Sequence, residues 1–120
     1  MKKLLVLLVF VLISGCIFGR KNAEEEKPVF YYFYSQTCPF CRDAGVYVET
    51  LSEKYPQIEI KTVDVNGSQE EREIHKRKRE KLNLRGGVPL FVMGENHVIG
   101  FRKGAQEKRI EAMIDKEIGK

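Results

Sequence analysis

The sequence predicts a single α/β domain with a central four-stranded mixed sheet, whose elements follow in the order strand, helix, strand, helix, strand, strand, helix. Three observations lead to this prediction: an aromatic run at residues 30–34, a helical apolar stripe at residues 41–55, and a proline-led apolar strand with a hairpin at residues 88–101. With 120 residues, of which 42% are hydrophobic, the chain can form one modest core.

The first strand and the helix after it are predicted from uninterrupted and periodic apolar patterns. Residues 30–34 are all aromatic, and a run without polar alternation is typical of a strand covered on both faces. Ser35-Gln36-Thr37 ends this run. The following apolar side chains recur at steps of three and four, which predicts one buried stripe of a helix. They are Cys41, Ala44, Val48, Leu51 and Tyr55.

The second strand and the second helix are predicted between residues 58 and 82. The segment from Ile58 to Val65 alternates apolar and polar side chains and ends at the turn-forming pair Asn66-Gly67. A strand, a helix and a strand of this length imply parallel pairing. The segment from Gln69 to Leu82 begins with Glu and ends with Lys and Arg, which suits the helix dipole.

The helix predicted at residues 69–82 is strongly charged, and its apolar stripe is thin. Ile74, Leu82 and the stems of Lys78 and Lys81 are the parts that it can bury. We therefore expect most of its surface to be solvated. An alternative is that residues 75–81 dock against anionic headgroups or an acidic partner.

The third strand is predicted from the segment Gly86 to Val92. Pro89 precedes an apolar run, where a residue without an N–H suits a strand entrance or a cis peptide in a tight turn. If the Val88-Pro89 peptide is cis and lies beside Cys38, the backbone of Val88 can pair with an extended substrate. The alternative is a plain loop proline.

The last two elements are a returning strand and a final helix. Gly94-Glu95-Asn96 predicts a turn, after which His97 to Phe101 returns as an antiparallel strand that ends before Gly104. The final helix is predicted from apolar residues on one face, which would pack on the sheet. These are Ile110, Met113, Ile114 and Ile118.

The segment Cys38-Pro39-Phe40-Cys41 places two thiols at the start of the first helix, and we predict that it is a redox-active dithiol. Cys41 begins the apolar stripe and is expected to face the core. Cys38 lies a turn earlier, where unpaired N–H groups and the helix dipole favour a thiolate, so it is the expected attacking thiol. Pro39 suits the first helical position.

The cysteine pair has two other interpretations. A zinc site would need two further ligands from Cys16, His75 and His97, which are scattered along the chain. His75 and His97 are therefore expected to be ordinary surface histidines, and no metal is expected. An inert structural disulfide is the other alternative, although cysteines at a helix start rarely have a purely structural role.

Residues 1–15 are predicted to be a signal peptide and residues 16–28 a lipidated cysteine with a flexible tether, which leaves residues 29–120 for the folded domain. Lys2-Lys3 precedes the apolar segment from Leu4 to Ile13, as in secretory signals. Small residues before Cys16 resemble a bacterial lipoprotein signal in which that cysteine is lipidated. An uncleaved N-terminal anchor is the alternative. Both place the domain at a membrane, outside the cytoplasm.

The charge of the chain argues against nucleic acid as a partner. Removing Lys2 and Lys3 from the 21 Lys and Arg residues leaves 19 basic against 17 acidic side chains, a formal charge of +2. So small an excess does not predict a basic nucleic-acid-binding surface.

From about Val29 to Ile118 the chain resembles the thioredoxin superfamily. The resemblance rests on Cys38-Pro39-Phe40-Cys41, on Gly87-Val88-Pro89 and on residues 101–105. It implies a thioredoxin-like three-layer sandwich in which Cys38 attacks, Cys41 resolves and Pro89 is a cis-proline facing them.

The chain also departs from the patterns of this superfamily. Pro39-Phe40 looks more like the middle of a glutaredoxin motif, but residues 99–102 lack the glycine pair and acidic residue with which glutaredoxins hold glutathione. Tyr32 and Thr37 stand where thioredoxins usually have a buried aspartate and a tryptophan.

The sequence therefore predicts a monomeric, membrane-anchored thiol-disulfide oxidoreductase that needs no bound cofactor. Its expected partners are protein disulfides or dithiols and a membrane-embedded electron donor or acceptor. Pro39, Phe40 and Pro89 would support the two cysteines, and Val88 with Pro89 would bind substrate. The alternatives are a non-catalytic adaptor that binds a membrane partner, or a glutaredoxin-like protein that uses glutathione or ligates a metal or iron-sulfur cluster.

Overall fold

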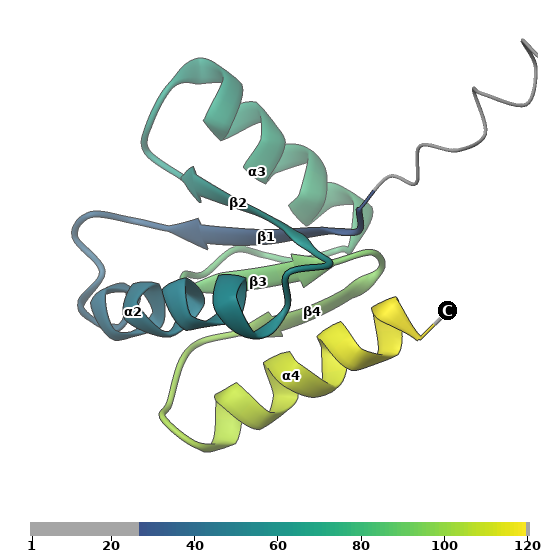
Figure 1. Ribbon diagram of the computed structural model, residues 1–120. Coiled ribbons are helices and arrows are strands. Elements are labelled where there is room, and N and C mark those ends of the chain that lie inside the picture. Colours follow the sequence, from purple (N-terminus) through teal and green to yellow (C-terminus); the bar gives the residue numbers. More distant parts are fainter. Residues whose placement is uncertain (1–26, 120) are drawn as a thin grey trace, which may run out of the picture.

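The computed structural model describes residues 27–119, and these residues form four strands and three helices in the predicted order (Figure 1). The elements are β1 (Val29–Tyr34), α2 (Pro39–Lys54), β2 (Glu59–Asp64), α3 (Gln69–Lys81), β3 (Leu90–Met93), β4 (Asn96–Ile99) and α4 (Ala105–Ile118). The predicted signal peptide, Cys16 and the tether up to residue 26 lie outside the described residues.

The four strands form one mixed sheet in the order β2-β1-β3-β4. β1 pairs with β2 in parallel, with Phe30 opposite Ile60, and it pairs with β3 antiparallel, with Tyr32 opposite Phe91. β4 returns antiparallel beside β3 through the turn at Gly94-Glu95. The central strands β1 and β3 are thus the ones covered on both faces, which agrees with the uninterrupted apolar runs in their sequences.

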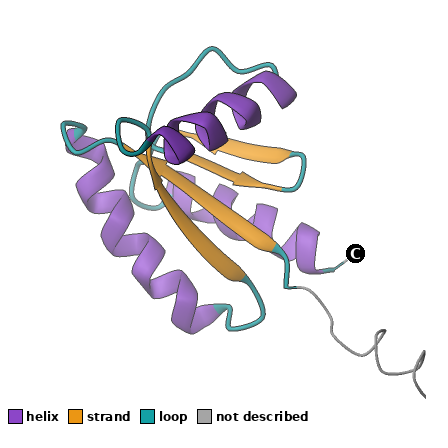
Figure 2. Ribbon diagram, turned by 90° about the horizontal axis from the view of Figure 1, so that it is seen from above, coloured by secondary structure: helices purple, strands orange, loops and turns teal. Residues whose placement is uncertain are grey.

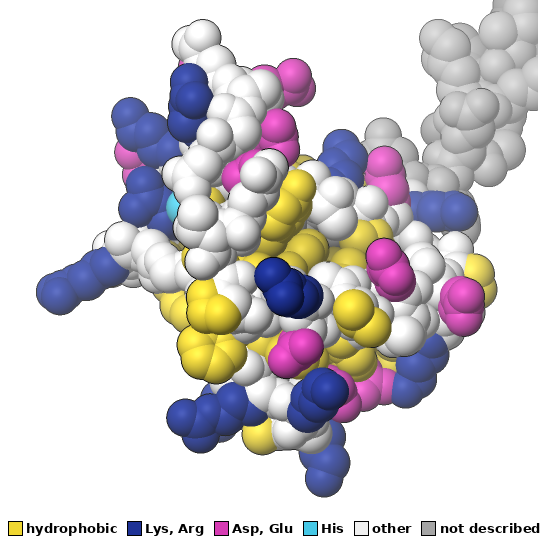
Figure 3. Space-filling view, turned by 90° about the vertical axis from the view of Figure 1, so that its left-hand side faces the viewer, with side chains coloured by type: hydrophobic (Ala, Val, Ile, Leu, Met, Phe, Trp, Pro, Cys, Tyr) yellow, Lys and Arg dark blue, Asp and Glu magenta, His cyan; other side chains and the backbone are white. Residues whose placement is uncertain are grey.

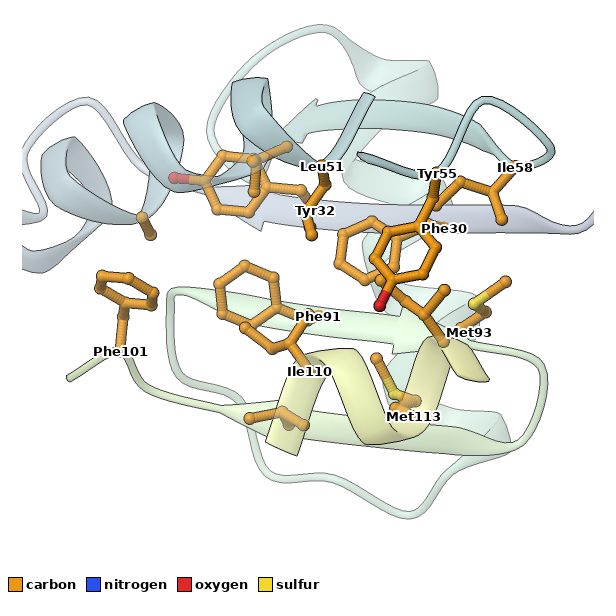
Figure 4. Close-up of a cluster of buried hydrophobic side chains, with 14 residues drawn as sticks. Phe30, Tyr32, Leu51, Tyr55, Ile58, Phe91, Met93, Phe101, Ile110 and Met113 are labelled. Atoms are coloured by element: carbon orange, nitrogen blue, oxygen red, sulfur yellow. The ribbon is translucent and has the colours of Figure 1, made fainter. Parts of the chain in front are cut away.

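Helices cover both faces of the sheet, so the domain has three layers (Figure 2). α2 and α4 pack on the face that carries Phe30, Tyr32 and Phe91, and together they enclose the larger part of the core (Figure 4). The α2 side chains in this core come from the predicted stripe, and α4 contributes Ile110, Met113 and Ile114. Lys54 at the end of α2 forms an ion pair with Glu111 of α4.

α3 packs on the opposite face, where the core is smaller. Phe33, Val63, Leu90 and Val92 are buried there, and Ile74 and Leu82 pack against them only in part. No residue of α3 is fully buried, as its thin apolar stripe predicted. The N-terminus of this helix is fixed by a capping box: the Glu71 N–H donates to the Ser68 hydroxyl oxygen, and the Ser68 N–H donates to the Glu71 carboxylate.

Several boundaries differ from the predicted ones. β4 begins at Asn96, which was expected in the turn, and ends at Ile99. Phe101 was expected in this strand, but it lies beyond the strand and is buried beside α4 all the same. Pro89 directly precedes β3 and is not part of its ladder. Apolar patterns record burial, and a buried side chain next to a strand gives the same pattern as one within it.

Within residues 27–119, no helix has both the length and the apolar character needed to cross a bilayer.

Candidate active site

The dithiol lies where β1 passes into α2, at the end of the sheet reached by the carboxyl ends of β1 and β2. The connecting loop is held by hydrogen bonds. The Cys38 N–H donates to the Ser35 carbonyl, and the Ser35 and Thr37 hydroxyls bond to each other at 3.0 Å. Figure 3 looks at this end of the molecule, where hydrophobic side chains are exposed among charged ones.

Cys38 is the N-cap of α2, and its side chain is half-buried. The Cys41 N–H donates to Cys38 Sγ at 3.2 Å, the role that a capping oxygen usually has. Pro39 occupies the first helical position, as predicted. A negative charge on this sulfur would therefore face a backbone N–H and the positive end of the helix dipole.

Cys41 lies on the buried side of the same turn. Only 5% of its surface is exposed, which confirms that it faces the core. Burial raises the pKa of the Cys41 thiol to about 11, and its hydrogen bond with the Cys38 sulfur acts in the same direction. At neutral pH Cys41 therefore holds its proton, and the two thiols of one motif occupy unequal environments.

Tyr32 lies beneath the dithiol. It is buried in the sheet, stacks on Phe91 with ring centroids 5.4 Å apart, and its hydroxyl donates to the Cys41 carbonyl at 2.7 Å. Burial raises the pKa of Tyr32, and the neighbouring cysteines raise it further. This phenol thus remains protonated and ties the first turn of α2 to the centre of the sheet.

The Val88-Pro89 peptide is cis and faces the dithiol. The Cys38 thiol donates to the Val88 carbonyl at 3.7 Å, which joins the motif to a segment 50 residues later in the chain. Gly86 and Gly87 precede this segment with φ values of 130° and 110°, a conformation that favours glycine. The Gly100 N–H donates to the Pro89 carbonyl at 2.8 Å and fixes the other end.

The fold agrees with that of solved thioredoxins. Oxidised mitochondrial thioredoxin 3 of Saccharomyces cerevisiae matches with a TM-score of 0.57 at 22% identity, over 81% of this chain and 89% of that chain. The chain has the thioredoxin fold. The reduced thioredoxin pre-protein of Schistosoma mansoni gives a TM-score of 0.57 at 24% identity, over 86% of this chain and 90% of that one.

Thioredoxin f of spinach chloroplast gives a TM-score of 0.54 at 26% identity, over 72% of this chain and 76% of that one. No protein-family model and no curated protein sequence matches the chain.

The thioredoxin fold brings together the residues that the sequence singled out around the dithiol. Cys38, Cys41 and Val88 are linked by the contacts above, Pro39 starts the helix, and Pro89 is the cis-proline. The side chain of Phe40 is 63% exposed beside them. Cys16 lies outside the described residues.

The two histidines do not join the dithiol. His97 is exposed on the edge strand β4. His75 was expected at the surface, but it is half-buried: its ring centroid lies 5.2 Å from that of Phe33, and its Nε2 is buried. Burial and the neighbouring Arg79 lower the pKa of His75. Residues 27–119 contain no group of three or more His, Cys, Asp or Glu side chains arranged to hold a metal ion.

Sequence reasoning missed a polar network that supports the dithiol loop. Asp64 and Ser35 are buried at the carboxyl ends of β2 and β1. Asp64 accepts hydrogen bonds from the Gln36 side chain at 3.2 Å and the Asn66 N–H at 2.9 Å, while the Asn66 side chain donates to the Ser35 hydroxyl at 3.1 Å. The signal available in the sequence was the cluster of short polar residues at the carboxyl ends of the first two strands.

Proposed function

We propose that this protein is a thiol-disulfide oxidoreductase that acts on protein disulfides through Cys38 and Cys41. The observation that carries the proposal is the unequal placement of the two thiols. Cys38 is accessible at the N-terminus of α2, whereas Cys41 is buried behind it with its proton retained. A reaction with an attacking and a resolving thiol requires this difference.

The proposed reaction has two displacement steps. The Cys38 thiolate attacks one sulfur of the substrate disulfide; the substrate S–S bond breaks, a Cys38–substrate disulfide forms, and the second substrate sulfur leaves as a thiolate that takes up a proton. Cys41 then loses its proton and attacks the Cys38 sulfur. The Cys38–substrate bond breaks, the Cys38–Cys41 disulfide forms, and the first substrate sulfur leaves as a thiolate that takes up the proton. Two electrons pass from the cysteine pair to the substrate. The same steps in reverse oxidise a substrate dithiol.

The segment at Val88 is the proposed docking strand for substrate. Its carbonyl already accepts a hydrogen bond from the Cys38 thiol, and the cis-proline after it directly precedes β3. An extended substrate segment that pairs with the Val88 backbone would bring its sulfur beside Cys38. This contact is to the main chain, so it suits substrates of many sequences.

We also propose that the protein is anchored to a membrane outside the cytoplasm and exchanges electrons with a membrane-embedded partner. The support is in the sequence: Lys2-Lys3, the apolar segment up to Ile13, and Cys16 after small residues. Replacing Cys16 with Ser in the full chain should abolish lipid attachment, as measured by mass spectrometry of the mature N-terminus. An unchanged, unmodified N-terminus in both proteins would contradict lipidation.

The enzymatic proposal is tested by following the reduction of a protein disulfide with a small dithiol as electron donor. Wild-type protein should accelerate the reaction, Cys38→Ser should lose the acceleration, and Cys41→Ser should stop after forming a mixed disulfide. Full activity of Cys38→Ser would refute the mechanism. If both variants still bound a membrane partner as wild type does and no protein showed dithiol turnover, the adaptor function would replace this one.

A further inference from the structure

A groove runs beside the dithiol, between the first turn of α2 and the first turns of α4. Its volume is about 510 Å³, and it is a different surface from the Val88 segment. Its lining includes Phe40, Phe101, Arg102, Ala105, Gln106 and Arg109. Because Phe40 stands between the two cysteines, any chain that occupies the groove is next to the reacting sulfurs.

The apolar part of the groove consists of one fixed and one exposed ring. Phe101 is buried, and its ring packs 5.6 Å from the ring of Tyr47 and 6.4 Å from that of Phe91. Phe40 is 63% exposed and makes no ring contact within the described residues. An apolar side chain exposed beside the reacting sulfurs is available to contact a substrate, and burying it on binding would be favourable.

The polar part of the groove is positively charged. Arg102 and Arg109 are exposed, and within residues 27–119 the one ion pair joins Lys54 to Glu111, so neither arginine is paired with a carboxylate. None of the described Asp and Glu side chains lines the groove. Gln106 adds an amide that donates to the Ile99 carbonyl at 3.5 Å. A guanidinium presents several N–H donors in a plane that matches a carboxylate.

We propose that this groove binds the polypeptide segment flanking a substrate's disulfide, and that it selects segments in which an apolar side chain is accompanied by Asp or Glu. The proposal rests on the oxidoreductase function above and adds a substrate class to it. Phe40 would contact the apolar side chain, and Arg102 and Arg109 the carboxylates. Backbone pairing at Val88 does not depend on the side chains of the substrate, so the groove determines which substrate sequences are preferred.

The test uses full-length protein and two model peptides. Each peptide carries one cysteine joined to 2-mercaptoethanol, followed by Leu and then either two Glu or two Lys residues. The kcat/KM for reduction of each peptide is divided by its uncatalysed rate with dithiothreitol, which removes differences in intrinsic disulfide reactivity. We expect a preference for the Glu peptide of about threefold to tenfold at low salt, and a smaller preference at high salt.

Charge reversal at the groove should invert this preference. In Arg102→Glu/Arg109→Glu the Lys peptide should become the better substrate, a gain that misfolding cannot produce. Lys108→Glu is the matched control for a single reversal, because Lys108 is an exposed residue of α4 outside the groove, and it should keep the wild-type preference. Arg109→Glu alone should reduce the preference for the Glu peptide.

The outcomes separate this inference from the proposed function. If wild-type protein reduces both peptides equally well and the double reversal changes nothing, substrate selection by the groove is wrong while the oxidoreductase function stands. If wild type accelerates neither peptide and no other protein disulfide, the oxidoreductase function itself fails. If Lys108→Glu changes the peptide preference as much as Arg109→Glu does, the preference reflects overall charge. This result would also overturn the inference.

Discussion

The two faces of the sheet are built differently. On one face, α2 and α4 bury large side chains against Phe30, Tyr32 and Phe91. On the other, α3 buries no residue completely and is held by partial contacts, such as those of Ile74, and by its capping box. The dithiol belongs to the first face, since Cys41 is part of the buried stripe of α2.

This difference indicates where the chain needs a fixed geometry. A thiol that must meet a mixed disulfide a few ångströms away has to be held in place, and close packing of the core provides that restraint. A helix that covers the opposite face needs only to keep water from Phe33 and its neighbours. The stability of the two faces should therefore differ, and perturbing them should affect the dithiol unequally.

The largest expected difference is between truncations in the two cores. Leu51 of α2 is completely buried, so Leu51→Ala should lower the free energy of unfolding by about 3 kcal/mol. Ile74→Ala on α3 should lower it by about 1 kcal/mol, because Ile74 is only half-buried. Denaturant unfolding measures both values. Equal losses would show that the two faces are equally well packed.

The next effect comes from the protonation of Cys41. Its folded-state pKa of about 11 lies above the ordinary value of 9.0, so the native state favours the thiol. The resulting stability is present in full below pH 9 and is lost as the pH rises from about 9 to 11, by about 2 kcal/mol. As the pH rises from about 9 to 11, the free energy of unfolding of the reduced wild type should fall by this amount more than that of Cys41→Ala. Urea unfolding at a series of pH values measures both. Parallel pH curves would contradict the burial of this thiol.

A smaller effect is expected at Tyr32. Tyr32→Phe keeps the stacked ring but removes the 2.7 Å hydrogen bond to the Cys41 carbonyl, which should cost about 1 kcal/mol. Tyr34→Phe is the matched control, because the Tyr34 ring stacks in the same row and its hydroxyl makes no hydrogen bond in the described part of the chain. If the control loses as much stability as Tyr32→Phe, the hydrogen bond is not the cause.

The smallest expected effect is on the other face. Ser68→Ala removes the capping hydrogen bond to the Glu71 N–H at 3.2 Å and should cost about 1 kcal/mol or less. Amide hydrogen exchange should accelerate in the first turns of α3, while disulfide reduction should stay within about twofold of wild type. A large loss of reductase activity would mean that α3 positions the dithiol after all.

Much of the fold and of the site could be predicted because the relevant signals are local. The aromatic run of β1, the stripe of α2 and the proline before β3 each report burial or backbone restriction within a few residues. The helix-start position of Cys38 followed from the spacing of that stripe and from Pro39.

The features that sequence reasoning missed depend on contacts between distant segments. The hydrogen bond from Tyr32 to Cys41 and the network of Ser35, Asp64 and Asn66 arise only when β1, β2 and α2 are packed together. His75 was placed at the surface because its neighbours in sequence are charged, whereas its ring reaches Phe33 across the layer. A charged stretch of sequence describes the average of a helix, not each of its faces.

The most direct test of the unequal thiols is to trap the mixed disulfide with a protein substrate and map it by mass spectrometry. Cys41→Ser should accumulate substrate joined to Cys38, because the resolving thiol is missing, and Cys38→Ser should accumulate almost none, because Cys41 is buried with its proton retained. Comparable trapping through Cys41 in Cys38→Ser would contradict the assignment of the attacking and resolving thiols.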